Sequence, residues 1–244
     1  MKQIQNITTI QPYLTLLPEN DAVFAPESSF LAKHLLPLVS IDLSVINPEW
    51  QGNIHLVNPI EPADSCIGDY THEYHNEFAG ENWFILQLNA NNHYHWLGQQ
   101  RYFILENENH HELCFGQTQP HSEAMHQDYL EVKARFKETG QIISTANLNF
   151  NHQYNTQNAN ILLNWIGGEF GFSNYVDTLA QYFDVRCVNR RTDDEEVHIY
   201  NQQGRRYYFI ACASGWQYCI SGADDILMFY QPETKRVLFP FDWT

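Results

Sequence analysis

The sequence is poor in positive charge and lacks long apolar runs. It has 13 lysine and arginine residues against 29 aspartate and glutamate residues, a formal net charge of −16. A surface this acidic repels a phosphate backbone, so the composition excludes a general nucleic-acid-binding protein. No stretch approaches the roughly 18 apolar residues that cross a bilayer, so we expect no membrane partner. The N-terminal residues carry no apolar signal segment, which predicts a cytoplasmic protein.

Cysteine is sparse and never occurs in a closely spaced pair. The 5 cysteines are spread along the chain without a Cys-x-x-Cys motif, which excludes a thioredoxin-type redox pair and a zinc knuckle. We expect free thiols that are buried as small apolar side chains. Aromatic residues make up 14% of the chain, which is too many for a disordered polymer, so we expect a folded core.

The motifs of common enzyme classes are missing. There is no Gly-x-Ser-x-Gly nucleophile elbow, no phosphate-binding loop that ends in lysine and no dinucleotide-binding glycine fingerprint. Paired carboxylates occur at Asp224-Asp225 and at 193–196 and would suit acid–base or metal chemistry, but turns commonly carry such residues. The sequence therefore favours a protein that is not an enzyme, with no catalytic residue, cofactor or metal ligand assigned.

Histidine is abundant, with 12 residues of which several lie close together. His72 and His75 are three residues apart and would share one face of a helix. His93 and His95 would share one face of a strand, a spacing that suits a metal ion. A third cluster is contiguous, at residues 110–112. None of the three has a zinc-site spacing, so surface histidines and a metal site both stay open as interpretations.

Hydrophobic periodicity predicts an α+β fold of mostly antiparallel sheets covered by a few helices, with a C-terminal β-meander. The best helix signal covers 122–139, with Ser122 as its cap and Gly140 as its left-handed end. Residues 59–81 read as a long surface loop or a partly helical excursion. Shorter helices are expected at 29–36, 157–166 and 176–182, and strands at 83–88, 101–106, 113–116, 197–200, 205–213, 216–220, 225–230 and 236–241.

Charge divides the chain into two parts. Residues 1–130 have three basic side chains against sixteen acidic ones, a net charge of −13, whereas residues 131–244 have ten against thirteen. We expect an acidic, β-rich part over 1–120, and a helix pair followed by the meander over 121–244. The two would form one compact domain or two tightly packed subdomains. A basic partner would be attracted to the first part.

The clearest acidic pattern lies between residues 69 and 81. Four carboxylates recur there every fourth residue, interleaved with aromatic rings. On a helix they would form one stripe of like charges that repel one another, and a basic partner would relieve that repulsion. Chance spacing in a loop is the alternative. The candidate partner-binding residues are Asp69, Tyr70, Glu73, Tyr74, Glu77 and Glu81.

The C-terminal half, about 120 residues, resembles a known class of proteins. Three features carry the likeness: Tyr129-Leu130-x-x-Lys133-x-x-Phe136 ending at Gly140, Trp165-Ile166-Gly167-Gly168-Glu169 with Ser173-Asn174-Tyr175, and the tail from Tyr207 to Thr244. The tail is most distinctive at 222–230 and 241–244. Together these features resemble the immunity proteins of polymorphic toxin systems, which are bacterial cytosolic proteins encoded beside secreted toxins, such as those of type VI secretion.

The resemblance implies a non-catalytic antitoxin that binds a cognate protein toxin and blocks its active site or substrate channel. The toxin would be a basic protein, since an acidic surface speeds association and aromatic side chains supply anchors that slow dissociation. Two alternatives stay open. One is a metal-assisted hydrolase that uses His93, His95 and nearby carboxylates, and the other is a housekeeping scaffold domain that binds another protein.

Overall fold

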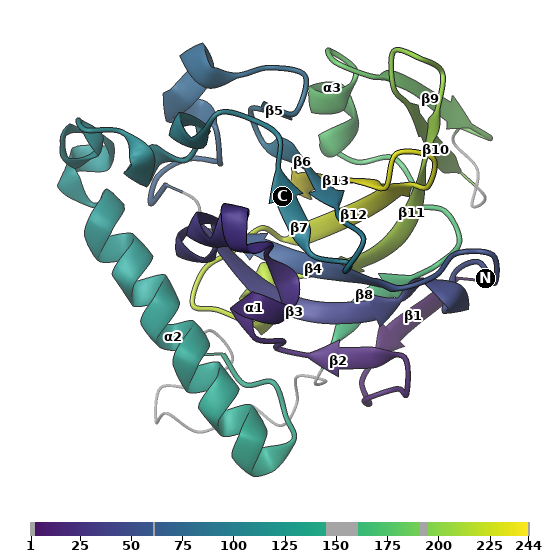
Figure 1. The fold of residues 1–244 in the computed structure, drawn as a ribbon, viewed down its shortest axis with the longest axis horizontal. Helices are drawn as coiled ribbons and strands as arrows, with labels where there is room; N and C mark the ends of the chain where they lie inside the picture. The colour runs from purple at the N-terminus through teal and green to yellow at the C-terminus, as the bar shows by residue number, and fades with distance from the viewer. Residues whose placement is uncertain (1–2, 61, 145–160, 191–194, 244) are drawn as a thin grey trace.

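The structure is an α+β fold built on antiparallel sheets (Figure 1). The computed structural model describes residues 3–60, 62–144, 161–190 and 195–243. Its strands are β1 (Ile4–Ile7), β2 (Leu14–Leu16), β3 (Leu35–Asp42), β4 (Asn53–Pro59), β5 (Ala79–Gly80), β6 (Trp83–Leu88), β7 (Tyr94–Trp96), β8 (Leu163–Ile166), β9 (Asp184–Val188), β10 (Glu196–Tyr200), β11 (Arg206–Ala213), β12 (Asp225–Gln231) and β13 (Arg236–Asp242). Its α-helices are α1 (Asn20–Val23), α2 (Thr118–Thr139) and α3 (Tyr175–Leu179). Its 3₁₀ turns are η1 (Pro26–Lys33), η2 (Leu43–Val45), η3 (Asp69–Tyr74), η4 (Gln100–Tyr102), η5 (Ile104–Glu106), η6 (His110–Glu112), η7 (Cys114–Gly116) and η9 (Gly215–Gln217).

The strands form two sheets. Among the described residues, a ten-stranded sheet follows the path β1-β8-β11-β12-β13-β6-β5, with β10 on β11, β9 on β10 and β7 on β6. A three-stranded sheet has the order β2-β3-β4. Strands from both ends of the chain meet in the large sheet, since β1 pairs with β8 and β6 pairs with β13. The predicted fold class and the C-terminal meander β10 to β13 are confirmed.

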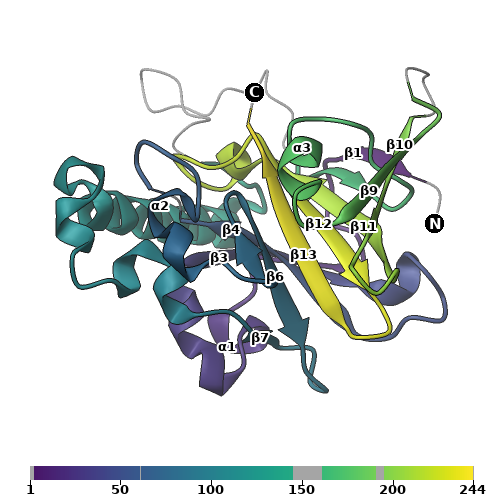
Figure 2. The same ribbon diagram turned by 90° about the horizontal axis from the view of Figure 1, so that it is seen from above.

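The central strands β12 and β13 of the large sheet are buried on both faces. Along β13, Val237 and Phe239 contribute to a core shared with the small sheet, whereas Leu238 points to a second core with α3 and β10. Figure 2 shows β3 and β4 on one side of β13, and α3, β9 and β10 on the other. This double burial explains why β12 and β13 are apolar at nearly every position instead of alternating.

The long helix α2 is the predicted one, but it begins at Thr118 rather than at Ser122. Ser122 is therefore buried within the helix and is not its cap. Met125 and Val132 lie on its buried face, as their spacing predicts. Gly140 ends the helix with a φ of 70°, the left-handed conformation expected of a C-terminal glycine.

Several predicted elements are wrong. The expected strands 101–106 and 113–116 are 3₁₀ turns, and 216–220 contains the turn η9. The short helix expected at 29–36 is present as the 3₁₀ helix η1, but it ends at Lys33 and the chain enters β3 at Leu35. Tyr102, Phe103 and Leu105 are buried from within these turns, so an apolar run here marks burial and not strand geometry.

The second helix expected over 157–166 is also wrong where the structure describes it. Residues 163–166 form β8, which lies between β1 and β11, and residues 157–160 lie outside the described residues. The third predicted helix is α3, and the hairpin turn before β11 carries Gly204 with a φ of 74°, as expected.

The five cysteines are free thiols, as predicted, although only three are buried and Cys66 and Cys187 are partly exposed. Within the described ranges, none of the helices has both the length and the apolar character that a bilayer crossing requires.

Candidate functional site

The segment that carries the predicted partner-binding residues is a surface excursion between β4 and β6. Only Asp69–Tyr74 is helical, as the short 3₁₀ turn η3, so the carboxylates do not form one stripe along an α-helix. Of the two interpretations of this spacing, the helical stripe is wrong, because the chain leaves the turn at His75 and enters extended backbone; the partly helical surface excursion predicted for this segment is confirmed. Glu73, Glu77 and Glu81 are exposed, whereas Asp69, Tyr70 and Tyr74 are half-buried.

A second segment, far away in sequence, packs against this excursion. The Thr71 hydroxyl donates to the Tyr102 carbonyl at 2.8 Å, and the Tyr102 hydroxyl donates to the Gly80 carbonyl at 2.9 Å. Arg101 Nη1 donates to the Tyr74 hydroxyl at 3.3 Å. Residues 62–81 and 100–117 are thus one surface unit, which we name the acidic lobe.

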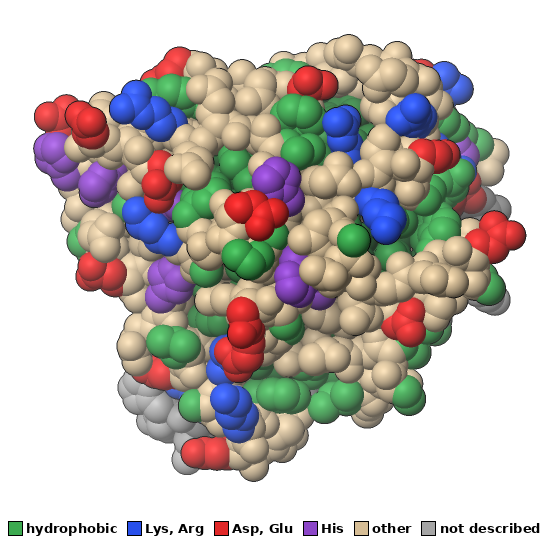
Figure 3. All heavy atoms as spheres, viewed as in Figure 1, with side chains coloured by type: hydrophobic (Ala, Val, Ile, Leu, Met, Phe, Trp, Pro, Cys, Tyr) green, Lys and Arg blue, Asp and Glu red, His purple; other side chains and the backbone are tan. Residues whose placement is uncertain are grey.

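The acidic lobe concentrates negative charge. It holds eight carboxylates against the single guanidinium of Arg101, a formal net charge of −7. Acidic side chains and histidines gather at the upper-left edge of Figure 3, where Figure 1 places the 100–117 segment. Within the described residues, Glu73, Glu77 and Glu108 are exposed and make no ion pair within 4.0 Å. Their charge is therefore available to a partner.

The lobe also presents an exposed aromatic ring. Phe115 is 92% exposed, the highest value among the exposed large hydrophobic side chains. Cys114 and Phe115 have φ values of 50° and 52°, in the left-handed region that costs non-glycine residues roughly 1–2 kcal/mol each. The sequence gives no signal for this turn, because neither residue type favours that conformation. Backbone strain of this kind is found preferentially at functional sites.

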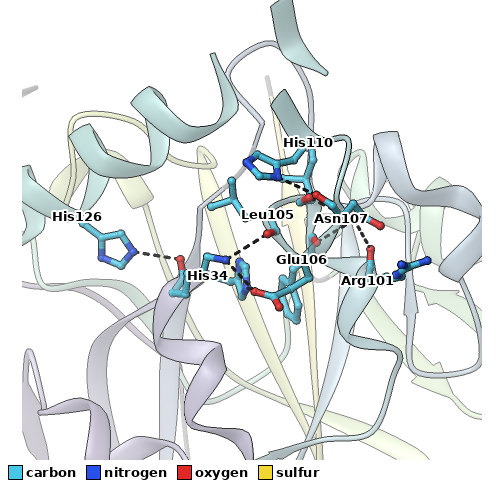
Figure 4. Close-up of polar contacts among 10 residues, drawn as sticks. His34, Arg101, Leu105, Glu106, Asn107, His110 and His126 are labelled. Atoms are coloured by element: carbon cyan, nitrogen blue, oxygen red, sulfur yellow. Dashed lines mark hydrogen bonds and ion pairs between the residues drawn. The ribbon is translucent and has the colours of Figure 1, made fainter. Parts of the chain in front are cut away.

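A polar cluster around the buried His34 fastens the lobe to the body of the protein (Figure 4). Glu106 accepts hydrogen bonds from Lys33 Nζ at 3.0 Å and from His34 Nε2 at 2.9 Å. Lys33 Nζ also donates to the Leu105 carbonyl at 3.2 Å. The His34 ring stacks on Phe103 with ring centroids 4.5 Å apart. The residues of this cluster are about 70 positions apart in sequence, so no local pattern indicates it.

Burial and hydrogen bonding set the protonation states in this cluster. Burial lowers the pKa of His34 to about 4, against the opposing effect of Glu106. Burial alone would raise the pKa of Glu106, but the hydrogen bonds from Lys33 and His34 outweigh it and the pKa is lowered. We therefore assign an ionised Glu106 and a neutral His34 that donates its single proton from Nε2.

Asn107 organises the turns of the second segment. Its Nδ2 donates to the carbonyl of Arg101 at 2.9 Å and to those of Phe103 and Ile104 at 3.2 Å each. His110 Nδ1 in turn donates to the Asn107 carbonyl at 2.7 Å. These bonds, seen in Figure 4, satisfy carbonyl groups that a strand would pair with a neighbour.

The first histidine cluster lies within the lobe. His72 Nε2 is 3.3 Å from Glu81 Oε2 and 3.9 Å from Asp69 Oδ1, and the ligand atoms of the three residues lie within 4.8 Å of one another. The His72 and His75 ring centroids are 5.1 Å apart, but His75 Nε2 donates to the Gly68 carbonyl. The structure thus brings two predicted site residues, Asp69 and Glu81, together around one imidazole.

The other histidine clusters do not converge on carboxylates in this way. His95 Nδ1 lies 3.3 Å from the Ser28 hydroxyl and 3.5 Å from Glu27. Neither His93 nor His95 belongs to a group of three potential metal ligands in the described part of the chain. The geometry therefore offers no support for a hydrolase centred on these two residues.

The paired carboxylates of the C-terminal half have distinct surroundings. Glu196 lies beside His198 and Glu169, and these three form the second group with ligand atoms within 4.8 Å. The Asp225 carboxylate accepts from Cys212 Sγ at 2.9 Å and from Asn164 at 3.2 Å, and burial raises its pKa. Residues 193 and 194 of the acidic run lie outside the described residues.

Comparison of the chain with protein-family models, with curated proteins and with solved structures finds no match.

Proposed function

We propose that the protein is an immunity protein that binds a basic protein toxin through the acidic lobe and thereby blocks its active site. The observation that carries this proposal is the joining of two distant segments into one surface with eight carboxylates and one arginine. The resemblance of the C-terminal half to immunity proteins agrees with it. The proposal places the protein in the bacterial cytoplasm, where such a toxin would act.

The lobe has the physical properties that such binding requires. Unpaired exposed carboxylates at Glu73, Glu77 and Glu108 attract a basic partner over several ångströms and raise the association rate. Phe115 supplies apolar area that is lost from water on binding, which slows dissociation. The hydrogen bond between His34 and Glu106 holds this surface in place before the partner binds, so less conformational entropy is lost on association.

Co-expression with the toxin encoded by the neighbouring gene tests this function. We expect cells that produce both proteins to survive, and we expect the pair to co-elute as one complex on gel filtration. Phe115→Ala should leave the fold intact but weaken the complex by at least tenfold, because an exposed ring contributes to binding and not to the core. Death of the co-expressing cells with no complex on the column would refute the proposal.

A further inference from the structure

A second group of ionisable side chains lies away from the acidic lobe, where β8, β10 and β11 meet. Glu196 and His198 are two residues apart on β10, so both side chains point to the same face of the strand. Glu169 follows β8 and reaches the same place, and the ligand atoms of the three residues lie within 4.8 Å of one another. We name these three residues the Glu169 cluster.

The backbone around Glu169 is fixed on both sides. Gly168 has a φ of 75°, and a Cβ added there would lie 2.6 Å from the Cβ of Gln3, so glycine is required. Gln3 Nε2 also donates to the Glu169 carbonyl at 2.7 Å. Gly168 thus positions the carboxylate of Glu169.

Two side chains of the Glu169 cluster, those of His198 and Glu169, are more buried than the histidine of the lobe cluster. His198 and Glu169 are only 18% and 26% exposed, whereas His72 in the lobe is 60% exposed. His198 Nε2 lies 3.0 Å from Glu196 Oε2, which is close to the distance between neighbouring ligands of one metal ion.

Arg206 supports the cluster from the side. Its Nη2 donates to Glu169 Oε1 at 2.7 Å, and its guanidinium lies 5.0 Å from the centroid of the Tyr208 ring. Metal-binding carboxylates commonly accept such an additional hydrogen bond, which orients them. Two carboxylates against one guanidinium leave a net negative charge that favours a cation.

The cluster is open to solvent on the side of Glu169. Glu169 lines two hollows of about 550 Å³ each, one bordered by Trp165 and Phe172 and the other by Trp50 and Tyr208. An ion held by three protein ligands next to open space retains positions for water or a small ligand.

We propose that Glu169, Glu196 and His198 bind a divalent transition-metal ion of the zinc type. One imidazole and two carboxylates are ligands that such ions commonly bind. The site should bind them more tightly than magnesium, which prefers oxygen ligands. The ion would tie β10 to the segment after β8. This inference is independent of the partner of the acidic lobe.

Calorimetric titration of the full chain with zinc chloride tests the proposal. We expect one ion per chain, an affinity at least tenfold lower in His198→Ala and in Glu196→Gln, and an unchanged affinity in the matched control His72→Ala. Circular dichroism of the metal-free variants checks that they fold. Magnesium chloride is expected not to displace zinc at equal concentration. Unchanged zinc affinity in His198→Ala, or an equal loss in His72→Ala, would overturn the assignment.

Discussion

The buried side chain of His55 is held by a hydrogen bond at each ring nitrogen, and these bonds fix its tautomer. His55 Nε2 lies 2.8 Å from the Asn92 carbonyl, which only accepts, so Nε2 carries the proton. Its Nδ1 then accepts from the Ser40 hydroxyl at 2.7 Å. The neutral ring thus satisfies both nitrogens, and burial lowers the pKa of His55 to about 4.

This pKa predicts that the protein loses stability as the pH falls. The unfolded chain has the ordinary pKa of about 6.5, so between pH 6.5 and 4 it binds more protons than the folded state. Stability from His55 is complete above pH 6.5 and declines by roughly 3 kcal/mol as the pH falls toward 4.

Urea unfolding at pH values from 7.5 to 4 measures this effect. The stability of His55→Gln should depend less on pH than that of the wild type, because glutamine does not titrate. His111→Gln is the control, since His111 is exposed. An identical pH dependence in His55→Gln and the wild type would show that His55 does not remain neutral in the fold.

At the scale of secondary-structure elements, the local sequence pattern predicts an element correctly where contacts between neighbouring residues determine its structure. The strands at 225–230 and 236–241 follow from apolar residues on both faces and a short turn between them, and they form a hairpin in the structure. Residues 161–166 have apolar residues at helical spacing, yet β1 and β11 supply hydrogen-bond partners on both sides of residues 163–166 and make these four a strand. Such pairing between distant segments overrides local preference.

The structure of residues 100–117 was predicted wrongly from the sequence for a related reason. Its apolar residues predict a strand. In the structure the Asn107 side chain donates hydrogen bonds to three carbonyl groups and so stabilises successive 3₁₀ turns. The candidate residues at 69–81 were predictable as an acidic surface. The packing of residues 69–81 against residues 100–117 was not predictable, and neither was the hydrogen bond between His34 and Glu106. Both depend on contacts between segments that are distant in sequence.

We expect Asn107→Ala to destabilise the protein by about 2 kcal/mol, because it removes the three hydrogen bonds of a buried amide and takes away the side-chain donor to the Arg101 carbonyl. Asn109→Ala is the matched control at an exposed position in the same segment and should change stability by less than about 0.5 kcal/mol. Urea unfolding of both variants measures the difference. Equal stability of the two variants would mean that Asn107 does not organise the turns.

At the scale of the whole molecule, scaffold and acidic surface are different parts of one fold. Strands from both ends of the chain build the large sheet, and the lobe emerges beside β6, near the edge of the sheet that ends in β5. The negative charge that composition reveals as a total is thus concentrated on a defined surface. The account predicts that association with a basic toxin is driven by this surface and is screened by salt.

The most direct test of this claim is the association rate of the protein with its cognate toxin. Glu73→Lys with Glu77→Lys reverses two lobe charges, and Glu49→Lys with Glu138→Lys reverses two exposed charges elsewhere. We expect the lobe pair to slow association at least tenfold at low salt and less at high salt, and the control pair to have a much smaller effect. Equal rates for the two double variants would contradict the account.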